Sequence, residues 1–170
     1  MRKSPRRCDI RPMEPADIPA LLPIEARCFG DHWTVQSFRD ELDQACSTYV
    51  VALLDGRIVG YAGFWLILEE AHITTVAVHP DQQGLGIGEQ LLLALVDASL
   101  ARAARWMTLE VRVSNVVAQK LYEKYGFTSL GRRRGYYQND GEDALVMWTE
   151  NMGSPEYQER LGVLRSRFPA

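Results

Sequence analysis

The chain is 170 residues long, with 46% hydrophobic and 24% charged residues, which is the composition of an ordinary globular domain with one sizeable core. Nineteen basic and twenty-two acidic side chains leave a net charge of −3, and this balance argues against direct binding to a nucleic-acid backbone. The three cysteines, Cys8, Cys28 and Cys46, are odd in number and lack Cys-x-x-Cys spacing. Neither a disulfide framework nor a thiolate zinc site is therefore expected.

Histidine spacing and hydropathy exclude two further classes of protein. His32, His72 and His79 never approach His-x-x-x-His spacing, so each is expected to be a surface or core residue rather than a metal ligand. No uninterrupted stretch of about 18 apolar residues occurs, and the basic segment 1–11 is not followed by the apolar run of a secretory leader. We expect a cytoplasmic protein without a membrane partner.

Hydrophobic periodicity predicts helices and strands along the whole chain. In chain order the pattern predicts two short helices within 17–42, strands at 49–54, 58–68 and 73–78, a helix from 88 to about 103, a strand at 106–113, a helix at 116–125, and strands at 128–130 and 144–148. Asp55-Gly56 is typical of a tight hairpin turn, while Ser114-Asn115 and Gly126 suit the start and the end of a helix. The last two strands are expected to pair, with Arg132-Arg133-Arg134 and a turn-rich loop between them.

The two ends of the chain carry weaker patterns. Residues 1–9 form a basic N-terminal tail, which we expect to be frayed; an RNA-binding arm is the less favoured alternative. In the C-terminal segment 152–170, Tyr157, Leu161 and Leu164 have the spacing of a marginal helix. No internal repeat indicates a second domain.

A glycine-rich segment, Gln83–Gly88, follows the strand at 73–78 and opens a helix. Because side chains are missing at alternate positions, its backbone N–H groups can close on a phosphate. The spacing fits neither a P-loop, which ends in Gly-Lys-Ser/Thr, nor a dinucleotide fingerprint, which needs glycine where Glu89 stands. From the glycines alone, a tight turn required only by geometry is an equally good explanation.

An ordered series of motifs surrounds this segment. It consists of Val76-Ala77-Val78, Gln83-x-x-Gly86-x-Gly88, Leu109-Glu110-Val111-Arg112, Ser114-Asn115 and Leu121-Tyr122-Glu123-x-x-Gly126-Phe127. In this series the chain resembles the GNAT N-acetyltransferases, over roughly residues 10–151. The later Arg134-Gly135-Tyr136-Tyr137 and Glu142-Asp143-Ala144 resemble, more narrowly, the bacterial members that acetylate the N-terminal alanine of a ribosomal protein.

The resemblance implies the fold and the domain organisation. The expected fold is the α/β GNAT fold, a mixed and mostly antiparallel sheet flanked by helices. Its sheet is splayed between the strands containing Val76 and Glu110, where acetyl-CoA enters. Residues 10–151 would form the acetyltransferase domain, between the basic tail of residues 1–9 and a C-terminal extension, residues 152–170.

The resemblance also assigns acetyl-CoA as co-substrate and names the residues that bind it, with no metal. The backbone of Val76, Ala77 and Val78 would hold the pantetheine arm, since an exposed strand edge offers an extended ligand the bonds of a neighbouring strand. The pyrophosphate would lie on the loop of Gly84, Leu85, Gly86, Ile87, Gly88 and Glu89. Asn115 would bond the cofactor's arm, with plain N-capping as the alternative. Gln83 and Glu89 stand where the family often has basic residues.

Two residues are the candidates for proton transfer. Glu110 is expected to point away from the main apolar face of its strand, and the resemblance makes it the general base, acting directly or through water. Partial burial is expected to raise its pKa toward neutrality. Tyr122 is the candidate acid for the departing thiolate, because a phenol with a pKa of about 10 lies only about 1.5 units above a thiol. The competing explanations are a solvated glutamate and a tyrosine that only packs its ring.

The acceptor implied by the resemblance is a protein N-terminal α-amine, most narrowly the N-terminal alanine of a small-subunit ribosomal protein, attacked in a ternary complex. Trp33, Tyr136, Tyr137 and Asp143 are candidate acceptor-binding residues. Asp143 and Glu142 could grip a cationic peptide, with an affinity that salt would weaken. The alternatives are a GNAT enzyme acting on lysine or a small amine, and a non-catalytic acyl-CoA-binding module. The turn at residues 31–34 departs from the family's Pro-Trp-Ser-like pattern.

Overall fold

The computed structural model describes residues 4–30 and 33–168, which form two compact units. The first unit consists of the described residues up to Leu66 together with Thr74–Ser99, and the second of Ile67–Ile73 and the described residues from Leu100 onward. Strand β4 (Glu70–Val78) begins in the second unit and ends in the first. In the part of the chain that is described, no helix is long and apolar enough to cross a membrane.

The first unit is built on an antiparallel sheet, β1 (Asp9–Pro12), β2 (Ser47–Leu54) and β3 (Arg57–Ile67), with the end of β4 beside β3. Asp55 and Gly56 form the β2–β3 turn with φ values of 51° and 77°, as their sequence predicts. The helical elements of this unit are η1 (Pro15–Asp17), α1 (Ile18–Phe29), α2 (Val35–Asp43), η2 (Pro80–Gln82) and α3 (Ile87–Ala101), whose last two residues fall in the second unit.

One hydrophobic cluster fixes α1 and α2 against this sheet. Leu21 and Ile24 of α1, Phe38 of α2 and Tyr61 of β3 are all at most 2% exposed. The rings of Phe38 and Tyr61 meet edge to face with centroids 5.5 Å apart. The predicted break near Gly30 is confirmed, since α1 ends there and Thr34 caps α2 by accepting a hydrogen bond from the Ser37 N–H.

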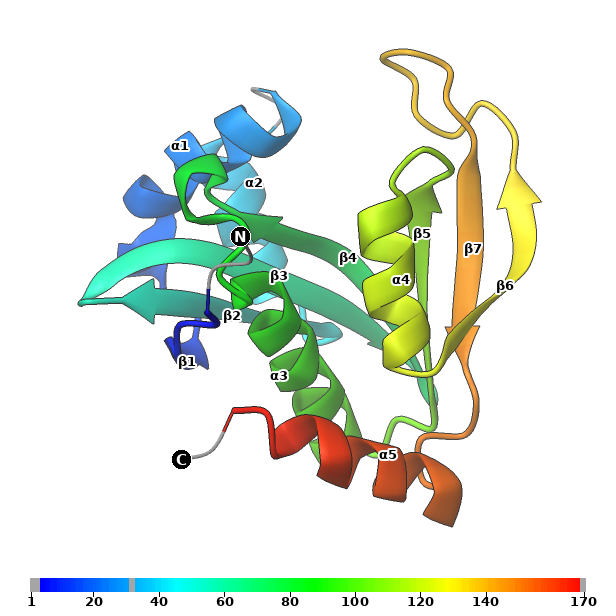
Figure 1. Ribbon diagram of the computed structural model, residues 1–170. Helices are drawn as coiled ribbons and strands as arrows, with labels where there is room; N and C mark the ends of the chain where they lie inside the picture. The colour runs from blue at the N-terminus through cyan, green and yellow to red at the C-terminus, as the bar shows by residue number, and fades with distance from the viewer. Residues whose placement is uncertain (1–3, 31–32, 169–170) are drawn as a thin grey trace. The chain divides into compact units, whose positions relative to one another are not determined.

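The second unit contains a sheet in the order β4-β5-β7-β6, with β5 (Trp106–Arg112), β6 (Phe127–Arg133) and β7 (Ala144–Thr149) visible as neighbours in Figure 1. Its helices are α4 (Val116–Lys124) and α5 (Pro155–Arg165). β4 and β5 run parallel, and β7 is antiparallel to both of its neighbours. The β4–β5 pairing joins residues 70–72 to 106–108 and stops there, although both strands continue through described residues.

Three expectations about chain segments need correction or extension. Residues 6–8 are not frayed, because the backbone of Arg6 and Cys8 is hydrogen-bonded within the first unit. Arg132 and Arg133 belong to β6 rather than to the following loop, because the strand pairs with β7 over six residues instead of three. The C-terminal helix is well packed rather than marginal, since Tyr157, Leu161 and Leu164 are buried.

Candidate active site

Glu110 lies on β5, and its side chain is only 8% exposed. The Nε2 atom of His72, on β4, lies 2.6 Å from Glu110 Oε2. The Nε atom of Arg133, on β6, lies 3.7 Å from Glu110 Oε1. One carboxylate is thus held by nitrogen atoms from two other strands of the second unit, so the solvated glutamate of a polar strand face is not what the structure contains.

The charge state of Glu110 differs from the sequence-based expectation. Burial raises its pKa, as expected, but the hydrogen bond and charge of His72 and the charge of Arg133 together lower it below its ordinary value. The predicted rise toward neutrality is therefore wrong, because the sequence did not reveal the two basic partners. Glu110 is a carboxylate at neutral pH, and the His72 ring nitrogen that faces it must be the donor.

His72 is the functional candidate that sequence reasoning missed. It was expected to be an ordinary surface or core histidine, and it lies on β4 with its side chain 33% exposed. Because His72 pairs with Thr108 across parallel strands, Glu110 follows two residues later and points to the same face. The only signal that could have found this contact is the register of a non-local strand pair, which no pattern within the chain specifies.

Tyr122 lies on α4, and its ring is tilted against Phe127 with centroids 5.7 Å apart. Burial, with a smaller contribution from Tyr137, raises the pKa of Tyr122 to about 12. The phenol therefore stays protonated at neutral pH, as a proton donor must. The pKa of Tyr122 is thus about 3.5 units above that of a thiol, which is about 8.5. The difference expected for an unperturbed tyrosine is about 1.5 units.

Asn115 performs the N-capping role that was considered as its alternative. Its Oδ1 accepts a hydrogen bond from the Ala118 N–H at 3.1 Å, at the start of α4. Capping uses only the oxygen of this side chain, so the amide nitrogen is not committed by that bond. Asn115 therefore fixes the beginning of the helix on which Tyr122 lies.

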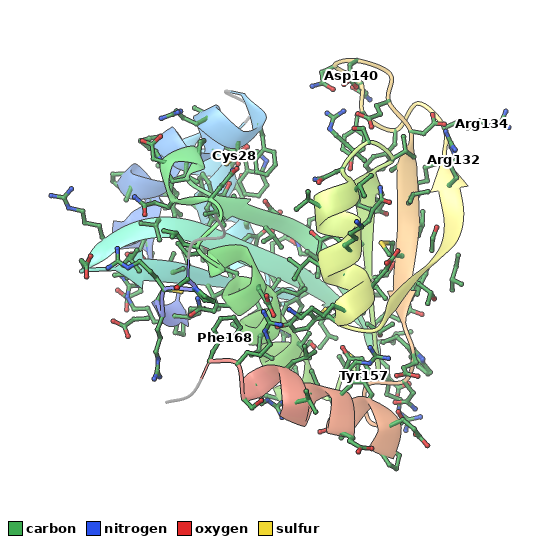
Figure 2. The ribbon with its side chains drawn as sticks, in the orientation of Figure 1. Cys28, Arg132, Arg134, Asp140, Tyr157 and Phe168 are labelled. Atoms are coloured by element: carbon green, nitrogen blue, oxygen red, sulfur yellow. The ribbon has the colours of Figure 1, made fainter. Side chains whose placement is uncertain are left out.

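Arg112, at the end of β5, organises the loop between β6 and β7. Its guanidinium carbon lies 3.9 Å from the centre of the Tyr137 ring, and its Nη1 atom lies 2.8 Å from Asp140 and 3.0 Å from Glu142. The rings of Tyr136 and Tyr137 meet edge to face at 5.0 Å. Figure 2 places Asp140 at the tip of this loop. The two tyrosines therefore lie on a loop that several side-chain contacts hold in shape.

The carboxylates expected to grip a cationic peptide are already used inside this loop. Glu142 accepts from the Ser114 N–H at 2.9 Å as well as from Arg112, and these bonds lower its pKa. Asp143 accepts from the Gly135 N–H at 2.8 Å and from Arg132 Nε at 2.7 Å, which lowers its pKa too. Both carboxylates stabilise the loop, so the charge that each could offer a peptide is largely neutralised.

Electrostatics link the candidate residues of the second unit. Burial raises the pKa of Tyr137 to about 12 against the lowering effect of Arg112, with smaller contributions from Tyr136 and then Glu110, and Tyr137 itself contributes to the raised pKa of Tyr122. Burial and then Glu110 also raise the pKa of Tyr136. The second unit thus gathers Glu110, Tyr122, Tyr136 and Tyr137 into one electrostatic environment, and sequence reasoning had selected all four.

The glycine loop belongs to the first unit and precedes α3, which begins at Ile87. Gly84 and Gly86 have φ values of +82° and +77°, a conformation that disfavours any residue with a Cβ atom. Nothing lies within 4 Å of the position that a Cβ of Gly84 would occupy, so this part of the loop faces open space. These features suit a phosphate-binding backbone at the start of a helix.

A second missed residue, Gln90, ties this loop to the N-terminal segment. Its Nε2 donates to the carbonyl oxygens of Arg6 at 2.8 Å and Gly86 at 3.2 Å, and its Oε1 accepts from the Cys8 N–H at 3.1 Å. The Arg6 N–H donates in turn to the Leu85 carbonyl at 2.9 Å. Gln90 is 6% exposed, and a buried polar residue one turn into an apolar helix was the available signal.

The end of β4 carries the remaining predicted cofactor contacts, Val76, Ala77 and Val78. The His79 N–H donates to Val59 on β3 at 2.8 Å, so strand alternation turns the Val78 N–H to the opposite edge. On that edge the Val78 carbonyl accepts from Cys28 Sγ at 3.3 Å and from Gln83 Nε2 at 3.2 Å. Gln83 thus contacts the strand, and burial raises the pKa of the Cys28 thiol.

Trp33 lies just before α2, in the first unit. Its ring meets Phe38 edge to face at 4.9 Å and Tyr49 at 6.5 Å, so it extends the hydrophobic cluster. Asp31 and His32, which belong to the atypical turn, lie outside the described residues. Among the residues that are described, no group of three or more His, Cys, Asp and Glu side chains is placed to hold a metal ion.

Comparison with known proteins identifies the class of this protein. Residues 18–127 match the Acetyltransferase (GNAT) family, so the chain belongs to the GNAT family and is an N-acetyltransferase. The fold expected from the sequence motifs is confirmed, because solved structures of this family share it.

More narrowly, the chain is similar to enzymes that modify a ribosomal protein. It is 41% identical over 140 residues to a protein of Bacillus subtilis (strain 168) provisionally named a ribosomal protein bS18-alanine N-acetyltransferase, with 82% of this chain and 93% of the relative covered. It is 38% identical over 138 residues to the N-alpha-acetyltransferase RimI of Mycobacterium tuberculosis (strain ATCC 25618 / H37Rv), and the match covers 78% of this chain and 85% of the relative. The crystal structure of the ribosomal-protein-S18-alanine N-acetyltransferase from Escherichia coli superposes on this chain with a TM-score of 0.78 and 32% sequence identity. The match covers 88% of this chain and 97% of that one.

Proposed function

We propose that this enzyme transfers the acetyl group of acetyl-CoA to a protein N-terminal α-amine, and that its acceptor is the N-terminal alanine of ribosomal protein bS18. The names of its relatives support this acceptor. The site observation that carries the proposal is the placement of Glu110, a largely buried carboxylate held by His72 and Arg133, whose hydrogen bond and charges lower its pKa.

A carboxylate with a lowered pKa is a weak base, and this favours one class of amine. An α-amine has a pKa of roughly 7.7–8.0, so about a third of it is already neutral at pH 7.5, whereas about 0.1% of a lysine with a pKa near 10.4 is neutral. Glu110 is suited to accept a proton from an amine during attack, but it is poorly suited to deprotonate a lysine first. This difference favours the N-terminal acceptor over the lysine-acetylating alternative.

The reaction needs two proton transfers. The neutral amine attacks the thioester carbonyl carbon, the C–S bond breaks, and the amine nitrogen gives up a proton to Glu110 directly or through a water molecule. Tyr122 donates its phenolic proton to the departing sulfur and recovers one from solvent. The raised pKa of Tyr122 keeps this proton in place until the thiolate forms.

The first unit would bind the cofactor. The backbone of Val76–Val78 would hold the pantetheine arm, and the loop of residues 84–89 would hold the pyrophosphate. The left-handed glycines and the open space beside Gly84 fit such a group. Because Gln83 contacts β4 and Glu89 is acidic, the phosphates would be bound by backbone N–H groups more than by side-chain cations. The amide nitrogen of Asn115 is proposed to contact the arm.

For the acceptor peptide we propose aromatic rather than ionic contacts. Tyr136 and Tyr137 are presented by a loop that Arg112 and Arg132 hold in shape, and Asp143 would act by maintaining that shape. Trp33 is proposed to line the acceptor's path in the first unit. Acetyl-CoA and a ribosomal protein are both cytoplasmic molecules, and we propose that the enzyme acts in the cytoplasm.

A panel of hexapeptides tests the acceptor class. Peptides beginning with Ala, Ser, Met or Gly are compared with one that has a blocked N-terminus and an internal lysine, by measuring release of the CoA thiol. We expect kcat/KM to be highest for the alanine-led bS18 peptide and turnover to vanish when the terminus is blocked.

Two outcomes would contradict the proposal. Comparable turnover of the blocked lysine peptide would transfer the function to the lysine-acetylating alternative. Binding of acetyl-CoA in calorimetry without turnover of any peptide would leave the second alternative, a binding module, although membership of an acetyltransferase family speaks against it.

A further inference from the structure

The C-terminal helix α5 contacts the end of α4, the helix that carries Tyr122. α5 lies beyond residues 18–127, which match the family, and both helices belong to the second unit. Figure 1 shows α5 beneath the C-terminal end of α4, and Figure 2 labels Tyr157 on the side of α5 nearest to it. The contact therefore joins a segment outside the family match to the helix of the proposed proton donor.

Two side chains of α5 bind carbonyl groups at the end of α4. The hydroxyl of Tyr157 donates to the Tyr125 carbonyl at 2.8 Å, in a bond that is wholly buried, and Arg160 Nη1 donates to the Lys124 carbonyl at 3.3 Å. The last carbonyl groups of a helix have no partner within that helix, and leaving one buried and unpaired is destabilising. α5 thus contributes a hydrogen-bond donor to each of these two carbonyl groups.

The ring of Tyr157 also determines how the chain leaves α4. Gly126 has a φ of +86°, and a Cβ atom built on it would lie 2.8 Å from Tyr157 Cε2. The turn after α4 therefore accepts only glycine while the tyrosine ring is in place. Phe127, the next residue, is the one against which the Tyr122 ring is tilted.

Tyr122 is hydrogen-bonded to the C-terminal end of α4, which α5 holds. Its carbonyl accepts a hydrogen bond from the Tyr125 N–H at 2.9 Å, so Tyr122 and the residue that Tyr157 holds share one turn of chain. None of the residues of α4 itself is fully buried. Two sets of side-chain hydrogen bonds hold this helix in place: Gln119, in its middle, donates to the Arg112 and Val113 carbonyl oxygens at 2.9 and 3.0 Å, and α5 binds its C-terminal end.

We propose that α5 is a positioning element for the proton donor, in which Tyr157 fixes the C-terminal end of α4 and thereby the phenol of Tyr122. The inference rests on the acid role assigned to Tyr122 in the proposed function. Tyr157 touches no reacting atom and acts through α4.

The test uses the full-length enzyme with the substitution Tyr157→Phe, which keeps the ring against Gly126 and removes only the hydroxyl. We expect kcat to fall by roughly 3–10-fold, because small displacements of a catalytic group are costly, while KM for acetyl-CoA stays the same. In a Tyr122→Phe background the same change should have no further effect on kcat, because the group being positioned is gone.

A matched control separates positioning from simple stability. Gln158 lies on the same helix and its Nε2 donates to the Met152 carbonyl at 2.7 Å, a bond that does not involve α4, so Gln158→Ala removes a hydrogen bond of α5 other than those to α4. We expect this variant to keep the wild-type kcat at a similar loss of melting temperature. If Tyr157→Phe proves unstable, Arg160→Met replaces it, since this change removes the bond to Lys124 and leaves the ring in place.

The possible results are distinguishable. A wild-type kcat in Tyr157→Phe, the same fold-loss in both backgrounds, or an equal loss in Gln158→Ala would overturn the positioning role alone. A Tyr122→Phe enzyme with near-wild-type turnover would instead overturn the acid role on which the inference rests.

Discussion

The glycine loop of the first unit and the Glu110 cluster of the second are held in opposite ways. The loop is held through its own main-chain groups. The Leu85 carbonyl accepts from the Arg6 N–H, and the Gly86 carbonyl accepts from the Gln90 side chain. The Glu110 carboxylate is held by the side chains of His72 and Arg133. A site built from main-chain groups depends on the path of the backbone, whereas a site built from side chains depends on the identity of each residue.

This difference predicts how each region responds to substitution. Changes around the loop should alter cofactor affinity through small shifts of the backbone and leave the chemical step intact. Changes in the Glu110 cluster should alter the chemical step and leave cofactor affinity intact. The four predictions below, from the largest expected effect to the smallest, would sharpen or break this division.

Glu110→Gln should have the largest effect. We expect kcat to fall by about 10²–10⁴, the usual range for a general base, with little change in the affinity for acetyl-CoA measured by calorimetry. Circular dichroism must first show that the variant folds, and Glu150→Gln, at an exposed position, is the matched control. Near-wild-type turnover at saturating peptide would show that Glu110 is not the base.

His72→Leu should change both the rate and its pH dependence. With its donor and charge gone, burial dominates and the pKa of Glu110 rises, so the base is protonated over part of the working range. In the wild type, Glu110 stays ionised over this range, so loss of the proton of the substrate α-amine should make log kcat/KM rise with pH at a slope of about 1 between about pH 5.5 and 7.

For His72→Leu we expect kcat to be lower by about tenfold and the slope to steepen toward 2 at the acid end, because two groups must then lose protons. His72→Gln, whose amide can still donate to the carboxylate, should recover most of the rate. An unchanged pH profile in His72→Leu would mean that the histidine does not govern the charge of Glu110.

Gln90→Leu tests the main-chain side of the comparison. The substitution removes both donors to Arg6 and Gly86 and the acceptor of the Cys8 N–H, so we expect a loss of about 1–3 kcal/mol in the free energy of unfolding. KM for acetyl-CoA should rise by roughly 3–10-fold with an unchanged kcat at saturation. Gln36→Leu, at an exposed position on α2, is the control, and a fall in kcat alone would break the division.

The smallest effect concerns salt. Glu142 and Asp143 are neutralised by Arg112 and Arg132, so salt should change kcat/KM for a basic hexapeptide by less than about twofold between 50 and 200 mM, and Asp143→Gln should not alter that dependence. This replaces the earlier expectation of a marked salt effect. A tenfold decline with salt would show that the acidic pair does meet the peptide.

The parts of the fold and the site that depend on local pattern could be predicted from the sequence. The Asp55-Gly56 turn, the glycine loop and Gly126 each require a backbone conformation that few residues adopt, and all three are as expected. The motif order around Glu110 and Tyr122 was sufficient to assign the family, which the comparisons confirm.

What could not be predicted depends on contacts between distant segments. His72 and Glu110 are 38 residues apart, and Gln90 and Arg6 are 84 apart, so only the folded chain shows that they meet. The sign of the pKa shift of Glu110 was wrong for the same reason. Tyr157 was expected at most to form a marginal helix, because its partner Tyr125 lies 32 residues away.

The end of the β4–β5 pairing has a consequence for local motion. The last residues joined by the ladder are His72 and Thr108, and the His72–Glu110 bond lies just beyond them. A side-chain bond at this point reinforces the end of the ladder that joins the two strands. The Met107 N–H donates to Thr149 Oγ1, at the β7 edge, so strand alternation turns the Thr108 N–H toward β4. Hydrogen exchange at Thr108 should therefore be slow and should become faster in His72→Leu, while exchange at Met107 should stay unchanged.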